Sequence, residues 1–297
     1  MTNPILVIGG TGLLSIPVVR HLLAEDYMVR VLTRFPEKVV SLFGGGCEAA
    51  SGDVTDPASL RPALQGCQAV YINLSGTVDT RMEARCVQNI LQAGGGLPLQ
   101  RIIYHSSTSV SAANCWFPPV AARYRAEQSL RLSPIPHTIF RSGYFMELLP
   151  ALQSRDRAIL PGRQPFAFHW FSGADYARMV SLSLASLATV NKTFNVQGPS
   201  YLRLKDALLI YCAAFQPRPH ILRLPLWVAS LVAALARRRP LQAALPILRY
   251  GIKMPEDGDP GEANTLLAAP QTTLEQWCAS LAGASTSSKA ETGHKPR

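Results

Sequence analysis

The sequence has no closely spaced pair of cysteines. Its six cysteines lie far apart along the chain, at Cys47, Cys67, Cys86, Cys115, Cys212 and Cys278. Zinc sites need ligands at short, fixed spacings, and disulfide frameworks concentrate cysteines in small secreted chains. We therefore predict neither a metal site nor a disulfide framework. The chain also lacks a basic segment before its first apolar run, so we identify no secretory signal and expect a reducing, cytoplasmic compartment.

The sequence also lacks a long hydrophobic run, since a membrane-spanning helix needs about 20 apolar residues. The longest charge-free apolar stretch near the C-terminus is LPLWVASLVAALA, from Leu224 to Ala236, with an arginine on either side. We predict no transmembrane segment and interpret this stretch as a buried helix of the C-terminal lobe. The alternative is a helix that lies on a membrane surface and is anchored by the arginine triplet that follows it.

Charged residues are few, at 16% of the chain, yet the formal net charge is +10. The basic residues are dispersed, apart from the triplet Arg237, Arg238 and Arg239. Dispersed arginine is compatible with nucleic-acid binding, but a phosphate-rich cofactor or a basic surface explains it equally well. We therefore predict no specific nucleic-acid site.

Short apolar runs alternate with helix-length segments through the first half of the chain. This alternation predicts an α/β fold with a doubly wound (Rossmann-type) parallel sheet between two helical layers. The expected strands are Ile5–Ile8, Met28–Leu32, Glu48–Ala50, Ala69–Asn73, Arg101–His105 and Thr138–Arg141. The expected helices are Ile16–Ala24, Ser59–Leu64, Thr80–Ala93 and Ala121–Leu132.

The regular alternation loosens from about Pro150 onward, where proline-punctuated segments predict a smaller C-terminal lobe for a substrate or a partner. We assign residues 1–150 to the nucleotide-binding domain and residues 151–282 to this lobe, which shares the core and is interrupted by a further strand near Thr193–Gln197. Residues 283–297 are small and polar, so we expect them to form a disordered tail.

A glycine turn joins the first expected strand to the first expected helix in ILVIGGTGLLSIPVVRHLL. Glycines let the backbone pass close to a phosphate, and the following helix points its free N–H groups at the anion. Ser15 takes the place of the third glycine of the common pattern and adds only one hydroxymethyl group there. We predict a dinucleotide pyrophosphate site at Gly9, Gly10, Thr11, Gly12, Leu13 and Leu14.

The end of the second expected strand indicates which dinucleotide binds. NAD sites place Asp or Glu roughly 20 residues beyond the glycines, whereas VRVLTRFPEK has Thr33 and Arg34 there, with Lys38 close behind. A guanidinium holds a 2′-phosphate with two charge-assisted hydrogen bonds, and a carboxylate repels it. We therefore predict NADP(H), although Glu37 is nearby. The alternative interpretation of Arg34 is a solvated surface arginine.

The carboxyl ends of the other strands select further candidates, because the ligand crevice of a doubly wound sheet lies there. The residues at these ends are Asp53, Asn73, Leu74, Ser75, His105, Ser106 and Ser107. Gly52-Asp53 is also a turn signal, so a turn role remains the alternative for Asp53.

With these motifs the chain resembles the atypical short-chain dehydrogenases/reductases and, within them, the NmrA-like group. The resemblance runs from about Asn3 to about Leu235. Its carriers are ILVIGGTGLL, VRVLTRFPEK, GDVTDPASLRPALQGCQAVYINLS, RIIYHSS and AEQSLRLSPIPHTIFRSGYFMELL. Together these blocks are far more specific than the glycine turn alone.

The resemblance implies roles along the cofactor. Asp53 and Val54 would flank the adenine, and Ser106 and Ser107 would lie beside the nicotinamide ribose. The residues expected to line the central part of the cofactor are Asn73, Leu74 and Ser75. Those expected to cover the nicotinamide are Gly143, Tyr144 and Phe145.

The Tyr-x-x-x-Lys pair of the larger superfamily is absent from the matching helix, where Tyr124 is followed four residues later by Gln128. Many NmrA-like relatives have a lysine four residues before a glutamate that matches Glu127, and here that position is Arg123. An arginine can hold the ribose or polarise a carbonyl, but its pKa above about 12 prevents it from donating a proton at neutral pH. We take Arg123 as the candidate catalytic residue. Tyr144, His105 or water are candidate proton sources.

Three hypotheses follow for function. The first is an NADPH-dependent reductase of a small apolar carbonyl, quinone or enone. The second is a non-catalytic, NADP(H)-sensing regulator or scaffold with a protein partner, because the tyrosine and lysine pair is missing. The third and weakest is an accessory subunit at a membrane.

Overall fold

The computed structural model describes residues 3–74, 80–154, 157–215, 220–235 and 239–292. The chain divides into two compact units. The first comprises Met1–Gly143, Gly173–Val196 and Asp257–Ala269, and the second comprises Tyr144–Ser172, Gln197–Glu256 and Pro270–Arg297. Each unit is therefore built from segments that are separated in sequence.

A seven-stranded parallel sheet forms the centre of the first unit. Its strands, in sheet order, are β11 (Lys192–Val196), β6 (His137–Ser142), β5 (Arg101–Ser107), β4 (Ala69–Ile72), β1 (Ile5–Ile8), β2 (Val29–Thr33) and β3 (Cys47–Ser51). Every residue of β1, β4 and β5 is buried. Strands that are buried along their whole length require cover on both faces, which explains the parallel, doubly wound arrangement.

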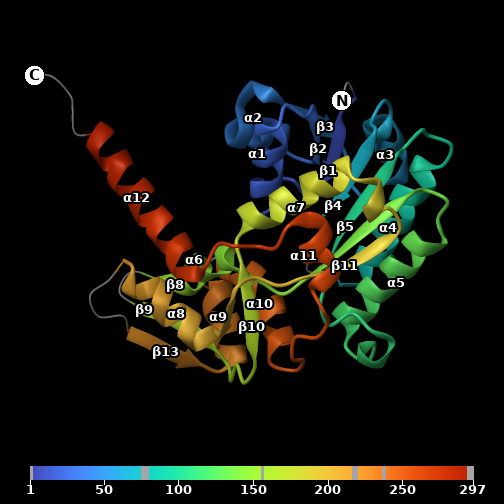
Figure 1. Ribbon diagram of the computed structural model, residues 1–297. Helices are drawn as coiled ribbons and strands as arrows, with labels where there is room; N and C mark the ends of the chain where they lie inside the picture. Colours follow the sequence, from blue (N-terminus) through green and yellow to red (C-terminus); the bar gives the residue numbers. More distant parts are fainter. Residues whose placement is uncertain (1–2, 75–79, 155–156, 216–219, 236–238, 293–297) are drawn as a thin grey trace, which may run out of the picture. The chain divides into compact units, whose positions relative to one another are not determined.

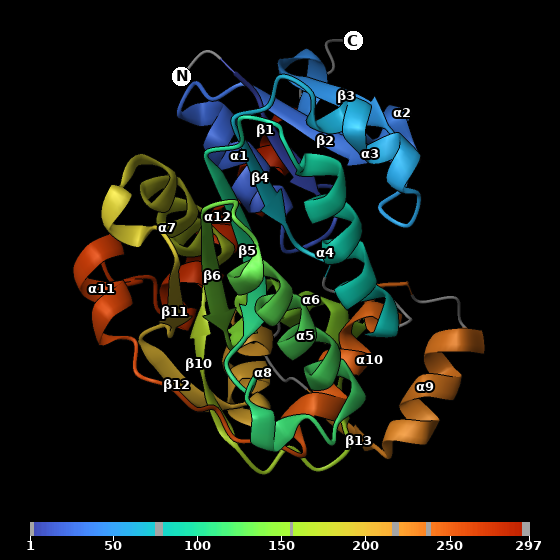
Figure 2. The same ribbon diagram turned by 90° about the vertical axis from the view of Figure 1, so that its right-hand side faces the viewer.

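Helices cover both faces of this sheet (Figure 1, Figure 2). They are α1 (Ile16–Ala24), α2 (Pro36–Phe43), α3 (Pro57–Leu64), α4 (Thr80–Gly94), α5 (Pro118–Leu132), α7 (Gly173–Ala185) and α11 (Gly261–Leu267). Helix α1 packs against α7, while α4 packs against both α3 and α5. Side chains of β5 contact α4 and α5 from one face and α7 from the other. The two helix groups therefore lie on opposite faces.

The chain reverses its direction across the sheet between β1 and β4. After β1 it builds outward through β2 and β3, and it then returns to add β4 on the other side of β1. A ligand of a doubly wound sheet binds at such a switch point, outside the carboxyl ends of the strands. The segments that follow β1 and β4 are therefore the first place to look for a site.

A buried arginine ties α7 to the sheet. Arg101 is 5% exposed, and its guanidinium donates to the main-chain oxygens of Ser183 and Ser186 and to the hydroxyls of Thr138 and Thr189. Ser183 and Ser186 stand at the end of α7, where a cation is favoured by the helix dipole. This contact helps residues 173–196 return to the first unit after a segment of the second.

The second unit contains two three-stranded sheets, β12–β10–β7 and β13–β9–β8. The strands are β7 (Tyr144–Phe145), β8 (Gln153–Ser154), β9 (Arg157–Pro161), β10 (Ala167–Phe171), β12 (Ser200–Arg203) and β13 (His220–Leu224). The helices are α6 (Leu149–Leu152), α8 (Leu204–Ala213), α9 (Leu226–Leu235), α10 (Arg239–Gly251) and α12 (Leu274–Thr292). Aromatic rings lie at its centre: Tyr144 stacks on Phe168 at 4.4 Å between ring centroids and meets Trp170 edge-on at 5.1 Å.

The predicted doubly wound α/β fold is confirmed by the parallel sheet. All six strands expected in the first half form, and the four expected helices form with small shifts at their ends. Helix α2 was not predicted, because the pattern of PEKVVSLF is short and only Val39 in it is buried. The two units are not separated by a single boundary near residue 150. Helix α7 and strand β11 come from a later part of the chain and complete the first unit.

The prediction of a buried helix over Leu224–Ala236 is wrong for the described residues. Helix α9 spans Leu226–Leu235, and only Ala229 and Ala233 in it are buried. Leu224 belongs to β13, and Ala236 lies outside the described residues. The apolar composition of the stretch correctly indicated a helix, but composition alone does not show which face is covered.

The C-terminal segment also differs from the expectation. Helix α12 continues to Thr292, so residues 283–292 are helical where the sequence predicted a disordered tail. Leu274, Trp277 and Cys278 anchor the first turns of this helix in the core of the second unit. Extending an existing helix costs less than nucleating one, which allows the polar residues to continue it.

Candidate functional site

The turn after β1 brings two chain segments into close contact. Gly9 has a φ of +80°, and a Cβ atom there would lie 2.0 Å from the main-chain oxygen of Asn73, which follows β4. The turn is closed by a hydrogen bond from Gly12 N to Gly9 O at 3.0 Å. Only glycine allows both this conformation and this approach, so the predicted turn forms at the switch point.

The same turn presents main-chain donors. Within the described part of the chain, the N–H groups of Thr11, Leu13 and Leu14 have no acceptor. Gly12 and Leu13 are exposed, and α1 begins immediately afterwards, at Ile16. Free N–H groups at the start of a helix form an anion site. The geometry thus fits a phosphate, and the donors are main-chain groups whose position the glycines set.

Thr33 and Arg34 lie at the end of β2, beside this turn in the sheet. Thr33 is buried, and its hydroxyl accepts a hydrogen bond from Phe35 N at 3.0 Å. The Arg34 side chain is 69% exposed and lies over the Phe35 ring, with 5.8 Å between Cζ and the ring centroid. Lys38 is exposed in the first turn of α2. Two cations are therefore available to an anion at this edge.

Asp53 lies close to Arg34, which the sequence alone did not indicate. Arg34 Nη1 is 3.8 Å from Asp53 Oδ2, while Asp53 Oδ1 accepts hydrogen bonds from the main chain and the hydroxyl of Thr55. The bonds from Thr55 are the main cause that lowers the pKa of Asp53, with Arg34 contributing less. Asp53 thus has the turn role that was its alternative interpretation, and it partly offsets the charge of Arg34. Val54, the next residue, packs against the core.

The residues after β4 are positioned by the sheet. Asn73 N donates to Ile8 O at 3.0 Å, and both Asn73 and Leu74 are buried. Ser75, the third residue predicted here, lies outside the described residues. Asn73 and Leu74 are thus placed beside the glycine turn, as the strand-end rule predicts.

Ser106 and Ser107 do not act as one pair. Successive side chains of a strand point to opposite faces, and the Ser106 hydroxyl donates to Glu127 Oε1 of α5 at 2.6 Å. The neighbouring His105 points to the other face and contacts Tyr176 of α7. Ser107, which has the parity of His105, is therefore directed away from Glu127. The place of both serines beside the nicotinamide ribose stays a prediction.

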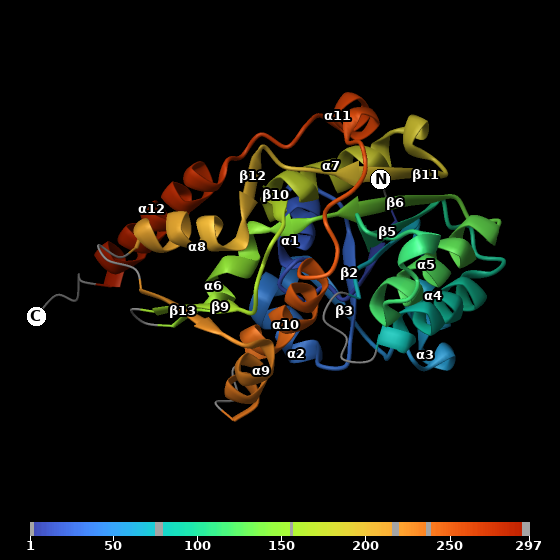
Figure 3. The same ribbon diagram turned by 90° about the horizontal axis from the view of Figure 1, so that it is seen from below.

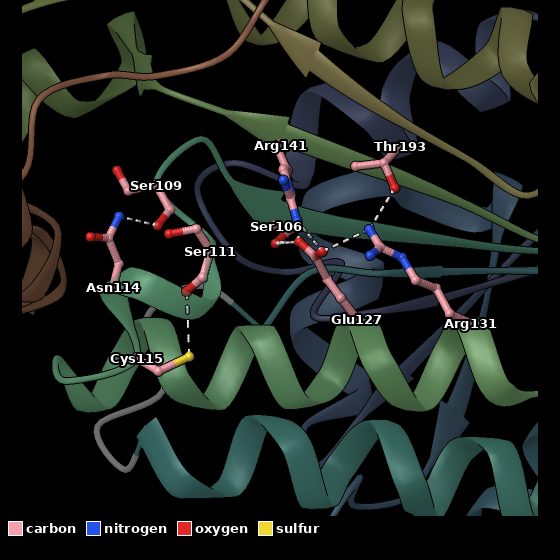
Figure 4. Close-up of polar contacts among 9 residues, drawn as sticks. All are labelled: Ser106, Ser109, Ser111, Asn114, Cys115, Glu127, Arg131, Arg141 and Thr193. Atoms are coloured by element: carbon pink, nitrogen blue, oxygen red, sulfur yellow. Dashed lines mark hydrogen bonds and ion pairs between the residues drawn. The ribbon is translucent and has the colours of Figure 1, made fainter.

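Glu127 is the centre of a buried charge cluster (Figure 4). Its side chain is fully buried, and Arg141 binds it in a bidentate manner, with Nε to Oε1 at 2.9 Å and Nη2 to Oε2 at 2.6 Å. Arg131 Nη2 lies 3.1 Å from Oε2 and also donates to the Thr193 hydroxyl. This carboxylate links α5 to β5 and β6 and holds the Ser106 hydroxyl at the end of β5, while Arg131 links α5 to β11.

Arg123, the candidate catalytic residue, is paired with a carboxylate that the sequence did not indicate. Its Nε lies 3.3 Å from Glu83 Oε2 on α4, and Glu83 Oε1 accepts from the Tyr104 hydroxyl at 2.8 Å. Burial and the charge of Glu83 raise the pKa of Tyr104. Tyr104 therefore stays protonated, and Arg123 has a fixed orientation in which part of its charge is compensated.

His105 is unsuited to act as an acid. It is 4% exposed, and its Nδ1 lies 3.0 Å from the Tyr176 hydroxyl. Burial is the main cause that lowers the pKa of His105 to about 3, and Arg123 contributes less. The ring is therefore neutral at physiological pH and belongs to the packed layer between β5 and α7.

Gly143 ends the first unit's opening segment, directly after β6, whereas Tyr144 and Phe145 belong to the second unit. Their side chains are 2% and 3% exposed and pack against other aromatic rings of that unit. Packing alone accounts for both rings, and their cover of a nicotinamide stays a prediction.

The side chains that the sequence missed as partners are Glu83, Glu127 and Tyr176. Each reaches β5 from a different helix, and the spacing of residues along the chain does not predict such a tertiary contact. Among the described residues, no three His, Cys, Asp or Glu side chains gather to hold a metal ion, and the six cysteines are free thiols. No helix in the described ranges has the length and apolar character to cross a membrane.

Comparison with known proteins identifies the family of the chain. Residues 1–204 match the model of the NmrA-like family, so the chain belongs to that family. It is 28% identical over 207 residues to the Photosystem II assembly factor Ycf39 of Trieres chinensis, a match that covers 65% of this chain and 63% of that protein. The chain thus matches less than two thirds of that relative's length.

An enzyme with a similar sequence and another with a similar fold extend the comparison. The chain is 26% identical over 204 residues to the NAD(P)H azoreductase of Xenophilus azovorans, covering 67% of this chain and 69% of that enzyme. Its fold resembles that of an NADPH-dependent quinone oxidoreductase of Escherichia coli crystallised with NADPH, with a TM-score of 0.70 and 20% identity over 93% of this chain and 99% of that one.

The buried cluster yields a stability prediction. Glu127→Gln should lower the free energy of unfolding by about 2 kcal/mol, because Arg131 and Arg141 lose their shared counter-charge but retain solvent contact. Urea unfolding measures the change. Glu48→Gln is the control, since Glu48 pairs with Arg30 at 2.8 Å but is 53% exposed, and it should cost less than about 1 kcal/mol. Equal costs for the two variants would contradict the cluster's role.

His105 yields a pH prediction. Its pKa is about 3 in the folded chain against an ordinary 6.5, so the unfolded state takes up a proton first as pH falls. Stability should therefore decline below about pH 6.5, by up to about 1.4 kcal/mol per pH unit from this group. His105→Gln should show a shallower decline between pH 7 and pH 5 in urea unfolding, whereas the exposed His220→Gln should match the unmodified chain. If His105→Gln left the pH dependence of the free energy of unfolding unchanged, the low pKa of His105 would be contradicted.

Proposed function

We propose that this member of the NmrA-like family is an NADPH-dependent reductase of a small apolar carbonyl, quinone or enone. The observation that carries the proposal is the turn after β1, where unpaired N–H groups stand at the start of α1, beside an exposed arginine at the end of β2. A pyrophosphate fits the N–H groups. A 2′-phosphate fits the guanidinium.

The preference for NADP(H) rests on the balance of charge at the end of β2. Arg34 is mostly exposed, and its contact with Asp53 is long, at 3.8 Å. Its remaining N–H groups can bind a phosphate in a bidentate manner, and Lys38 adds a second positive charge. Asp53 and Glu37 oppose this preference only partly, because Asp53 is held by its turn bonds to Thr55. The Escherichia coli enzyme of similar fold was crystallised with NADPH, which agrees with this preference.

The remaining cofactor contacts are proposed from the order of the strands. Asp53 and Val54 would stand at the adenine, Asn73, Leu74 and Ser75 at the central portion, and Ser106 and Ser107 at the nicotinamide ribose. The Ser106 hydroxyl is held by its bond to Glu127. Gly143, Tyr144 and Phe145 would complete the nicotinamide end.

Bound NADPH would supply the hydride, and this chain's residues would supply orientation and charge. We assign Arg123 the stabilisation of negative charge on the reduced oxygen, since its guanidinium stays protonated. Glu83 fixes its direction. Because His105 is neutral and buried, the proton that completes the reduction would come from Tyr144 or water.

Electron-accepting, conjugated substrates fit this chemistry. A hydride and one proton convert a quinone to a hydroquinone, with NADPH oxidised to NADP⁺. Such substrates need charge stabilisation more than a strong acid, which agrees with the missing Tyr-x-x-x-Lys pair. The names of two relatives, an azoreductase and a quinone oxidoreductase, agree with this class. The free cysteines agree with a reducing, cytoplasmic location.

A second candidate function is an NADP(H)-sensing scaffold without catalysis. The observation that favours it is the absence of a side chain suited to donate a proton among Arg123, Tyr104 and His105 in the described site. One relative is an assembly factor. In this case a protein partner would bind with an affinity that depends on the NADPH/NADP⁺ ratio.

Cofactor preference is tested by calorimetric titration. Arg34→Ala should weaken NADPH binding by tenfold or more, because a hydrogen-bonded ion pair contributes about 1.5–3 kcal/mol. NADH binding should change little. Arg20→Ala, which removes an exposed arginine of α1, is the matched control. Equal NADPH and NADH affinities that Arg34→Ala leaves unchanged would overturn the preference.

Catalysis is tested by NADPH consumption with a panel of quinones, aldehydes and enones. We expect steady turnover with at least one quinone or enone, and a loss of kcat of about tenfold or more in Arg123→Gln, since one charge-stabilising contact is removed. Tight NADPH binding with no turnover across the panel would reject the reductase. A pull-down partner that dissociates when NADP⁺ replaces NADPH would then identify the scaffold.

A further inference from the structure

In helix α9 the fully buried side chains are small, and three of the large ones are exposed. Ala229 and Ala233 are fully buried, whereas Trp227, Leu231 and Leu235 are 69%, 50% and 77% exposed. Positions four apart lie on one face of a helix, so these three form a single apolar stripe. The usual amphipathic pattern of a surface helix is reversed here.

Nothing polar interrupts this stripe. Helix α9 carries no charged residue, and its one polar side chain, Ser230, donates to the main-chain oxygen of Leu226. Helix α9 packs on β9 and α10 (Figure 3). Strand β13, which precedes α9 in the chain, carries Leu222, which is 45% exposed. An exposed apolar stripe like that of α9 marks an interaction site.

The charged residues that lie near α9 in the sequence have one sign. From Ala207 to Pro255 the sequence contains no Asp or Glu. Its basic residues are Arg218, Arg223, Arg237, Arg238, Arg239, Arg249 and Lys253. This stretch therefore contributes seven of the chain's ten excess positive charges, which are not dispersed after all. In the structure, Arg249 of α10 donates to the Ser230 hydroxyl of α9 at 3.0 Å, and Arg223 is exposed on β13.

We propose that α9 binds the surface of an anionic lipid bilayer, with Trp227, Leu231 and Leu235 inserted at the headgroup boundary and Arg223 and Arg249 on lipid phosphates. Tryptophan favours this boundary, and basic residues near an anionic leaflet add to binding. With 10 residues, α9 is about 15 Å long, half the hydrocarbon thickness of about 30 Å. It therefore lies on the membrane and does not cross it.

A second copy of this chain is a poorer occupant. A symmetric pair through α9 would bring the same acid-free segment of each copy together. Like charges at close range repel and would oppose the contact. The apolar stripe alone does not separate a lipid surface from a partner protein, but an anionic surface satisfies the stripe and the charge together.

Vesicle flotation of the full chain tests the proposal. It should float with phosphatidylcholine vesicles that contain about 30 to 40 mol% phosphatidylglycerol, which makes their surface strongly anionic. It should bind vesicles of phosphatidylcholine alone far more weakly. Leu231→Ser/Leu235→Ser should lower the bound fraction about tenfold or more through lost apolar burial. The matched control is Leu132→Ser/Leu187→Ser, two leucines of the first unit that are 85% and 86% exposed, and it should float like the unmodified chain.

The charge contribution has its own test. Arg223→Gln/Arg249→Gln should weaken binding to anionic vesicles by on the order of fivefold for each arginine and reduce the effect of added salt. Brominated lipids should quench tryptophan fluorescence in the unmodified chain but not in Trp227→Phe. Thermal unfolding of each variant confirms that it is folded.

Four outcomes would overturn the proposal. The first two are no flotation with either lipid and equal flotation of the α9 variant and its control. The third is a dimer in sedimentation without lipid that Leu231→Ser/Leu235→Ser converts to monomer. The fourth is an acidic partner protein captured through α9 in place of vesicles. None of these measurements uses NADPH, so their result is independent of the proposed reductase.

Discussion

The contact between Gly9 and the carbonyl of Asn73 is the constraint on which the site depends. It holds the turn after β1 against the segment after β4, where the strand order of the sheet reverses. With any side chain at Gly9 these segments would separate, and the N–H groups of Thr11, Leu13 and Leu14 would lose their fixed direction. The end of β2 lies at a fixed position relative to this turn, because β1 pairs with β2 in register up to Ile8 and Leu32. Arg34 therefore stands at a set place relative to the phosphate donors.

At the other end of the site, successive side chains of β5 point to opposite faces of the sheet. Tyr104 and Ser106 point to α4 and α5, where Glu83 and Glu127 bind them, while His105 points to α7. Both carboxylates are compensated by arginines, so each is a fixed structural charge. The strand end is thus rigid but contains no group that gives up a proton near neutral pH. This rigidity suits hydride transfer by a bound cofactor and equally suits a sensor that only binds one.

The sequence predicted the parts of the fold and site that local patterns determine. The buried strands, the glycine turn and the cation at the end of β2 follow from neighbouring residues, and they lie where expected. The partners of Arg34, Arg123 and Ser106 could not be predicted, because Asp53, Glu83 and Glu127 reach them through tertiary packing. The exposure of α9 was misjudged for a related reason. Its residues are apolar all round, so periodicity contains no information on which face the protein covers.

The net positive charge of the chain is concentrated in one stretch of the sequence. Outside residues 207–255, acidic and basic residues nearly balance, since that stretch has seven basic and no acidic side chains. The rest of the chain has an excess of only three positive charges. Most of the excess lies in the sequence on either side of α9, a helix that exposes Trp227, Leu231 and Leu235. Charge and apolar surface thus coincide in one segment, and that segment contains none of the residues proposed to hold the cofactor.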